Sequence, residues 1–176
     1  MIDAESIALE LKKKLADPVN GVAVAITNIN TIKAQGDPNM GVDTDLVNYG
    51  QTIICDIPQP EFWYFEIVNE SVVNSNSWLC ISEEGFELDG LGGGVSVTLK
   101  MKVAIGFTDA GDFTTPPKTW RYRSALRQVF EEFRFIYGLG SDTARIKDLK
   151  SEPLTDKRGS SWREVGILLE MSFAAY

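Results

Sequence analysis

The carboxylates are the first candidates for catalysis or metal binding, because the 176-residue chain contains no histidine. Without histidine the commonest general base is absent, as are the serine and cysteine triads that use it and most zinc sites. The densest carboxylate group is DPNMGVDTD, with Asp37, Asn39, Asp43 and Asp45. It lacks the spacing and the closing glutamate of an EF-hand loop. We expect a polar surface loop there, with calcium binding as the alternative.

A second candidate for chemistry is the glycine-rich stretch DGLGGGVSVTLKMKVAIGF, residues 89–107. Glycine loops that bind phosphate lead into a helix, whose free N–H groups meet the anion. This stretch instead leads into strict alternation of apolar and polar or small residues. The apolar positions are Val95, Val97, Leu99, Met101, Val103, Ile105 and Phe107. The pattern predicts a long antiparallel strand with one dry and one wet face, and the glycines are interpreted as a flexible hairpin tip or bulge.

The two cysteines, Cys55 and Cys80, are far apart and have no Cys-x-x-Cys spacing. A metal site is not expected from them, and the sequence leaves open whether they pair; buried free thiols are the default. Paired carboxylates elsewhere leave a histidine-free hydrolase as a third hypothesis, because pairing in space is invisible in sequence. We assign no catalytic, cofactor-binding or metal-binding residue and expect no enzymatic activity.

Length and composition predict one domain over residues 1–176, with residues 58–94 as a candidate β-rich insertion. The net charge is -8, from 17 basic and 25 acidic residues, which argues against a general nucleic-acid binder. Residues 1–100 carry 5 basic against 15 acidic residues, whereas residues 101–176 carry 12 against 10. Such asymmetry suits head-to-tail contacts between copies, or simply reflects which elements face water. Since no signal or membrane-spanning run is found, we expect a soluble protein made in a cytoplasm.

The elements that would position these residues follow from periodicity. An amphipathic helix is expected from Ala4 to Leu15 with Asp3 as N-cap, and VAVAITNINTI is predicted as a strand. QTIICDI, EFWYFEIV and SWLCIS are predicted as short strands. TWRYRSALRQVFEEFRFIYG is predicted as the main helix, ending at Gly138, and an alternating strand closes the chain after a polar stretch. The expected fold class is α+β: a mostly antiparallel sheet with long strands, packed on its dry face against this helix, plus the short N-terminal helix.

Three groups of residues are candidates for a subunit interface. Four consecutive aromatic residues must alternate between the two faces of a strand, so two of them need a second cover from a partner or from the same chain. Two lysines on the wet face would pair with acidic residues of a neighbour, and three arginines would form a basic patch or an ordinary solvated face. The candidates are Phe62, Trp63, Tyr64, Phe65, Lys100, Lys102, Arg121, Arg123 and Arg127.

The order of elements resembles the tail-terminator and head-tail joining (neck) proteins of tailed bacteriophages. The resemblance rests on a short N-terminal helix, a small-residue strand, a long alternating strand, the helix RYRSALRQVFEEF and the final strand EVGILLEMSFAAY. It implies a structural virion protein, assembled in the host cytoplasm, that forms a ring, typically hexameric. Implied partners are a tail tube or sheath protein and a head-tail connector protein, with genomic DNA passing through unbound and no membrane contact. Residues 58–94 are not accounted for by the resemblance.

A different class of function remains open. The chain would then be a non-viral, monomeric or dimeric β-rich module that binds a ligand or protein through the aromatic residues 62–65. The sequence does not determine the ring stoichiometry, the neck position or the neighbouring proteins. Assembly state separates the two hypotheses.

Overall fold

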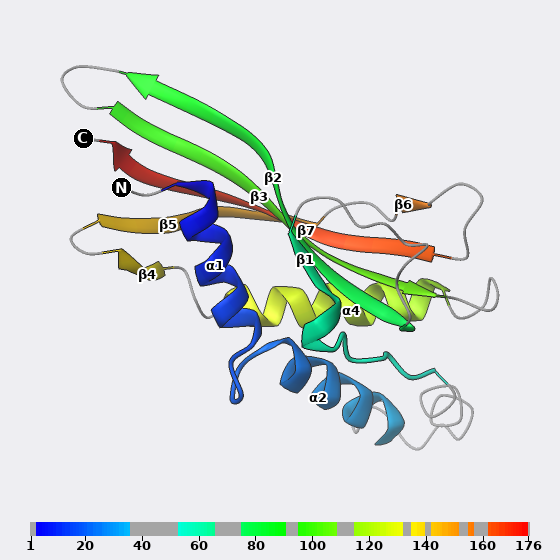
Figure 1. Ribbon diagram of the computed structural model, residues 1–176. Helices are drawn as coiled ribbons and strands as arrows, with labels where there is room; N and C mark the ends of the chain where they lie inside the picture. The colour runs from blue at the N-terminus through cyan, green and yellow to red at the C-terminus, as the bar shows by residue number, and fades with distance from the viewer. Residues whose placement is uncertain are drawn as a thin grey trace.

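The computed structural model describes residues 3–35, 53–65, 75–90, 95–108, 115–131, 135–139, 142–151, 155–156 and 162–175. The helices are α1 (Ala4–Leu15), α2 (Val22–Gln35) and α4 (Thr115–Glu131), with a short 3-10 helix η1 (Pro60–Phe62). The strands are β1 (Trp63–Phe65), β2 (Ser77–Gly90), β3 (Val95–Thr108), β4 (Phe135–Leu139), β5 (Asp142–Ser151), β6 (Thr155–Asp156) and β7 (Trp162–Ala175). Helix α4 runs along the sheet and α2 packs beside it (Figure 1). The expected α+β class is confirmed.

The strands form one sheet in the order β1-β2-β3-β7-β5-β4, with β6 also paired to β7. Among the described strands only β1 and β2 pair in parallel, and the other pairs are antiparallel. Strand β3 pairs with β7 without interruption from Val95 opposite Ala175 to Thr108 opposite Trp162. Its other edge pairs with β2, so the two longest strands of the expected alternation lie side by side at the centre of the sheet.

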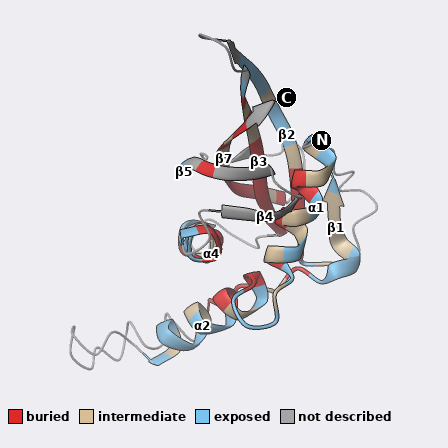
Figure 2. Cartoon of the chain, turned by 90° about the vertical axis from the view of Figure 1, so that its left-hand side faces the viewer, coloured by how far each residue is buried: buried red, intermediate tan, exposed pale blue. Residues whose placement is uncertain are grey.

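One face of the sheet is dry and carries the main core. The odd-numbered residues of β3 from Val97 to Phe107 are all buried, as the alternation predicted. Strand β2 changes phase at an irregularity between Glu83 and Gly85. This irregularity places Leu79 and Ile81, before it, on the same face as Phe86 and Leu88, after it, because an extra residue re-aims a strand by one position. Figure 2 shows the buried centre of β3 and β7 and the exposed outer part of β2.

Helices α1 and α4 cover the dry face, and α1 follows the prediction closely. The Asp3 carboxylate accepts a hydrogen bond from the Ser6 N–H at 2.7 Å, which caps the helix and lowers the pKa of Asp3. Its buried residues are Ile7, Ala8, Leu11 and Leu15. In α4, the Phe107 and Tyr122 rings meet at 5.1 Å between centroids and join helix to sheet.

Three predicted element assignments are wrong, those of residues 22–32, 53–57 and 135–138. VAVAITNINTI forms helix α2 instead of a strand, because Val22, Ala25 and Ile26 are buried at helical spacing and this packing overrides their β propensity. The Asp17 carboxylate accepts from the N–H groups of Val19 and Asn20 just before the helix.

The main helix does not reach Gly138. Helix α4 ends at Glu131, and Phe135–Leu139 is strand β4, paired with β5. The aromatic and β-branched residues there fit a pleated strand, and pairing decides the outcome. The polar stretch before the last strand contains β5 and β6, which the sequence pattern did not indicate.

On the wet face a glycine makes room for a tryptophan. A Cβ atom built on Gly106 would lie 1.9 Å from Cε2 of the fully buried Trp78, whereas one on Gly85 would only contact Lys100 Cδ at 3.8 Å. Gly106→Val should therefore lower the free energy of unfolding by about 1–3 kcal/mol or more, since overpacking displaces rigid neighbours. The matched control Gly85→Ala should change it by less than about 1 kcal/mol. Urea denaturation of both variants measures the difference, and equal stabilities would contradict this packing.

Candidate interaction surfaces

Residues 53–57, the described part of the predicted strand QTIICDI, do not form a strand. Side chains hold its backbone instead. The Asn30 amide donates to the Cys55 carbonyl at 2.9 Å and accepts from the Cys55 N–H at 3.1 Å. The Tyr122 hydroxyl donates to the Asp56 carbonyl at 2.9 Å. Hydrogen bonds to side chains thus replace a strand ladder here, because buried backbone groups need partners.

This segment also explains why one of the candidate arginines is not at the surface. Arg121 is buried and donates to the Ile53 carbonyl, so its interpretation as part of a basic patch or a solvated face is wrong. Arg127 is exposed and pairs with Glu131 at 3.0 Å, one helical turn away, as expected from their spacing. Arg123 is half-buried. The three arginines therefore do not gather into one exposed patch.

The aromatic residues 62–65 divide between the two faces as predicted. Trp63 packs against the main core, and its indole N–H donates to the Pro58 carbonyl at 2.9 Å. Phe62 and Tyr64 pack on the other face against a second buried cluster. That cluster is formed by Trp78, Cys80 and Trp162. The second cover for Phe62 and Tyr64 therefore comes from this chain, and their role in a subunit interface remains a prediction.

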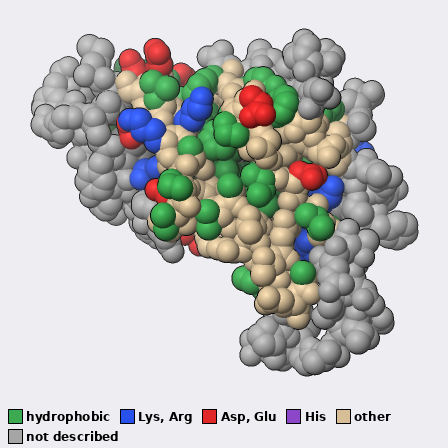
Figure 3. Space-filling view, turned by 60° about the horizontal axis from the view of Figure 1, so that its bottom comes forward, with side chains coloured by type: hydrophobic (Ala, Val, Ile, Leu, Met, Phe, Trp, Pro, Cys, Tyr) green, Lys and Arg blue, Asp and Glu red, His purple; other side chains and the backbone are tan. Residues whose placement is uncertain are grey.

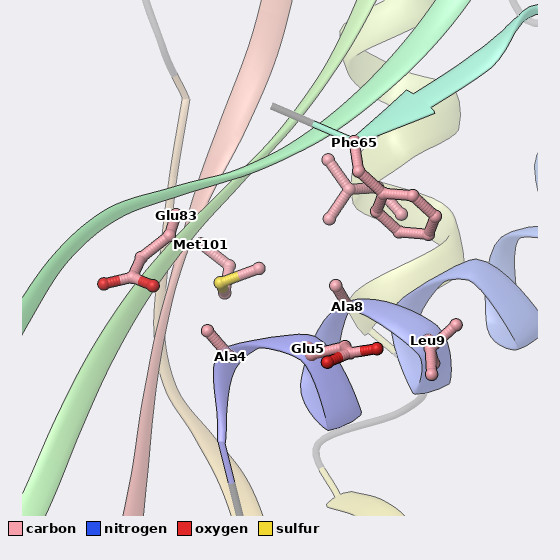
Figure 4. A pocket seen from close by; sticks show the side chains of 8 residues that line it. Ala4, Glu5, Ala8, Leu9, Phe65, Glu83 and Met101 are labelled. Atoms are coloured by element: carbon pink, nitrogen blue, oxygen red, sulfur yellow. The ribbon is translucent and has the colours of Figure 1, made fainter. Parts of the chain in front are cut away.

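Phe65 differs from its three neighbours because its side chain is 43% exposed. It lines a cleft of about 560 Å³ between α1 and the sheet. Figure 4 shows Phe65 of β1 across from Ala8 and Leu9 of α1, and the cleft also carries the carboxylates of Glu5 and Glu83. The Lys12 ammonium lies 5.4 Å from the centre of the Phe65 ring. Mainly apolar walls with few polar groups are typical of small-molecule pockets.

The apolar surface continues along β2 beyond this cleft. Phe86 and Leu88 are 54% and 62% exposed, on the same face as the buried Leu99 and Val97 opposite them in β3. We call Leu9, Phe65, Phe86 and Leu88 the hydrophobic strip. Figure 3, in which the bottom of Figure 1 comes forward, shows hydrophobic side chains gathered near the middle of that face with a few charged ones among them.

The wet face carries ion pairs that cross the strands. Lys100 contacts Glu87 at 2.5 Å, and Lys102 contacts Glu164 at 2.6 Å. Lys150 of β5 contacts Glu170 at 3.1 Å. Hydrogen bonding to Glu87 raises the pKa of Lys100, and hydrogen bonding to Glu170 raises that of Lys150. Both candidate lysines thus have acidic partners within the chain, while their contact with a neighbouring copy remains a prediction.

Neither cysteine is in a disulfide, and both are buried. Burial raises the pKa of the Cys55 thiol to about 12. Within the described ranges, no group of three or more acidic or cysteine side chains is placed to bind a metal ion. The candidate calcium loop, with Asp37, Asn39, Asp43 and Asp45, lies outside those ranges, as do the glycines of residues 91–94. No described helix combines the length and apolarity needed to cross a membrane.

No protein-family model matches the chain, and no curated protein matches it. Among solved structures, a chain from the virion of a native gene transfer agent (GTA) particle is similar with a TM-score of 0.38 and 10% sequence identity. The likeness covers 88% of this chain and 98% of that chain.

The raised pKa of Cys55 predicts an unreactive thiol, because the thiolate is the nucleophile. A thiol-alkylating reagent at pH 8 should leave Cys55 unmodified in the folded chain and modify it after unfolding in urea. Since the folded pKa lies above the unfolded value near 9, stability from this group is complete below pH 9 and is lost as pH rises toward 12. Mass spectrometry after labelling, with Cys80→Ser to isolate the site, measures reactivity. Rapid labelling of the folded chain would contradict the burial of Cys55.

Proposed function

We propose that this chain is a structural virion protein of the tailed-phage type, which forms a ring that ends the tail tube and joins it to the head or neck. The order of α1, the long strand β3, the amphipathic α4 and the final strand β7 supports the proposal. Helix α2 departs from the small-residue strand that the resemblance implied. The proposed role is non-enzymatic, and the polar groups described above serve packing and ion pairing.

The observation that carries the proposal is the hydrophobic strip. Phe86 and Leu88 extend the dry face along the outer part of β2, where the described helices leave them more than half exposed. Large exposed apolar side chains that continue from a cleft mark surfaces for association. Burying a pair of side chains this large in an interface would contribute about 1.5–3 kcal/mol each at full burial. A subunit of an assembly requires such a surface.

Charge supports the same proposal. A chain with a net charge of -8 does not attract phosphates, so a ring of such chains would let DNA pass without retaining it. The acidic first hundred residues and the slightly basic remainder suit contacts in which one side of a subunit meets the opposite side of the next. The proposed partners are further copies of the chain, which would form a hexameric ring. The ring would also bind a tail tube or sheath protein and a head-tail connector protein.

Solution mass across a concentration series tests ring formation. The expected result is a closed ring, seen by negative-stain microscopy, that dissociates on dilution. Phe86→Ser combined with Leu88→Ser should weaken association at least about tenfold, because an apolar contact worth more than about 1.4 kcal/mol is lost. The control Val19→Ser with Ile32→Ser removes two side chains that are as exposed, at 69% and 56%, but lie in other parts of the chain. Equal loss in both double variants would contradict a specific role for the strip.

The cleft beside Phe65 favours a second candidate function, a binding module for an apolar ligand. In that case the purified chain should stay monomeric or dimeric and bind an apolar fluorescent probe. Phe65→Glu should weaken this binding at least about tenfold, because it adds a third carboxylate to the cleft. Trp120→Glu is the control, since Trp120 is 63% exposed on α4, away from the cleft residues. Fluorescence titration measures the affinity of the probe for both variants. An unchanged affinity in Phe65→Glu would contradict this function.

A further inference from the structure

The cleft between α1 and the sheet exists because α1 changes from small to large side chains along its inner face. Ala4 and Ala8 line the cleft, one helical turn apart. Leu11 and Leu15 continue the same face of the helix and are buried in the core. Alanine ends at Cβ, so the first half of the helix leaves space above the sheet that the leucines fill in the second half. The volume of about 560 Å³ lies within the range of sites for small molecules.

Glu83 places a carboxylate on the otherwise apolar dry face of β2. The other residues of this row each pair with a buried residue of β3, and they are Leu79, Ile81, Phe86 and Leu88. Glu83 itself lies opposite the buried Met101. The irregularity of β2 begins at Glu83, and such irregularities are over-represented beside functional sites, where they re-aim a side chain. A carboxylate at this position adds nothing to the core, but it lines the cleft.

A second carboxylate lines the cleft from the helix. Figure 4 shows Glu5 on α1 and Glu83 on β2, on the two sides of the cleft. Both side chains are exposed, and within the described part of the chain neither carboxylate has an ion-pair or hydrogen-bond partner. Glu5 also suits the first turn of a helix, where a negative charge is stabilising, whereas Glu83 has no such role. Two carboxylates beside apolar walls attract a positive charge, and the net charge of -8 acts in the same direction over longer distances.

The third feature of the cleft is an aromatic ring that contacts a cation. Ring faces attract cations electrostatically. The Lys12 ammonium lies 5.4 Å from the centre of the Phe65 ring, although Lys12 does not line the cleft. Phe65 is still 43% exposed with this ammonium in place. The ring therefore accepts a cation from within the chain and remains accessible from the cleft.

We propose that the cleft binds a small organic cation, in which an apolar body carries one ammonium group. The apolar body would contact Ala8, Met101 and the Phe65 ring, and the ammonium would lie beside Glu83 and Glu5. A neutral ligand would cover the carboxylates without pairing them, and an anion would be repelled, so the sign of the charge selects the ligand. The proposal rests on the second candidate function, the binding module, and names the class of its ligand. It does not depend on ring formation.

A matched series of three ligands tests the charge preference. The compounds meta-hydroxyphenyltrimethylammonium and meta-tert-butylphenol have nearly the same shape and differ by the positive charge, and meta-hydroxybenzenesulfonate carries a negative one. In isothermal titration calorimetry the cation should bind at least about tenfold more tightly than the neutral compound, because its charge meets two carboxylates in a partly shielded cleft. The anion should bind more weakly than either. Added salt should weaken the binding of the cation but not of the neutral compound.

Glu5→Gln with Glu83→Gln removes both charges and keeps the size of the side chains. The affinity for the cation should fall at least about tenfold, whereas the neutral compound should bind as well as before or better. The control Glu61→Gln with Glu131→Gln changes the net charge equally; both side chains are exposed and neither lines the cleft. It should leave the preference for the cation intact. Melting curves of both double variants check the fold.

Two further variants change the affinity in different ways. Lys12→Met removes the ammonium beside the Phe65 ring and keeps an apolar stem. The affinity for the cation should rise about twofold or more, since a like charge near the site is lost, and the neutral compound should bind as before. Ala4→Leu should instead weaken the binding of both compounds, because the larger side chain occupies the cleft.

The outcomes separate the inference from the function on which it rests. Equal affinities for the cation and the neutral compound would overturn the charge preference and leave the binding module intact. A preference for the cation that survives Glu5→Gln with Glu83→Gln would place the charge contact elsewhere and overturn the site. Tighter binding of the anion would also overturn it. If none of the three compounds binds at millimolar concentration, both the inference and the binding module are overturned.

Discussion

The structure depends on the uninterrupted register between β3 and β7. Fourteen residue pairs, from Val95 opposite Ala175 to Thr108 opposite Trp162, fix which side chains share a face. Because side chains alternate, this single register commits the odd-numbered residues from Val97 to Phe107 and from Val165 to Phe173 to one dry surface. A surface of that size must be covered, and α1 and α4 are placed over it. Helix α2 then packs against α4, and segment 53–57 is tied to both by Asn30, Arg121 and Tyr122.

The two faces of the sheet meet different needs along its length. Near one end, the face opposite the main core is covered by an apolar cluster. Trp78 and Trp162 pack there with ring centroids 6.1 Å apart, and Phe62 and Tyr64 pack against them. Farther along, the same face carries ion pairs in place of rings. Gly106 lies in this apolar cluster, and the Trp78 ring occupies the space that a side chain at position 106 would need. The sheet thus has a second apolar cluster on this face near one end and ion pairs farther along.

Much of the framework follows from the sequence because its signals are local. The alternation in β3 and β7, the helical spacing in α1 and the division of residues 62–65 between two faces need only neighbouring residues. Helix α2 was missed because Val22 and Ile26 favour strands in isolation, while packing against α4 favours a helix. Strand β5 has few apolar residues and is recognisable only from its pairing with β7. The burial of Arg121 and the ion pairs that cross the strands depend on contacts distant in sequence, so no local pattern reveals them.

The central register also has a consequence for synthesis. Strand β3 ends at Thr108 and its partner β7 begins only at Trp162, whereas β2 immediately precedes β3 and forms a local hairpin with it. At about 5–20 residues per second, a ribosome leaves the hairpin without β7 for several seconds. During that interval one long apolar face and one long strand edge are open on every nascent chain. We expect the acidic residues of β2 to slow the association of two unfinished hairpins, since like charges repel.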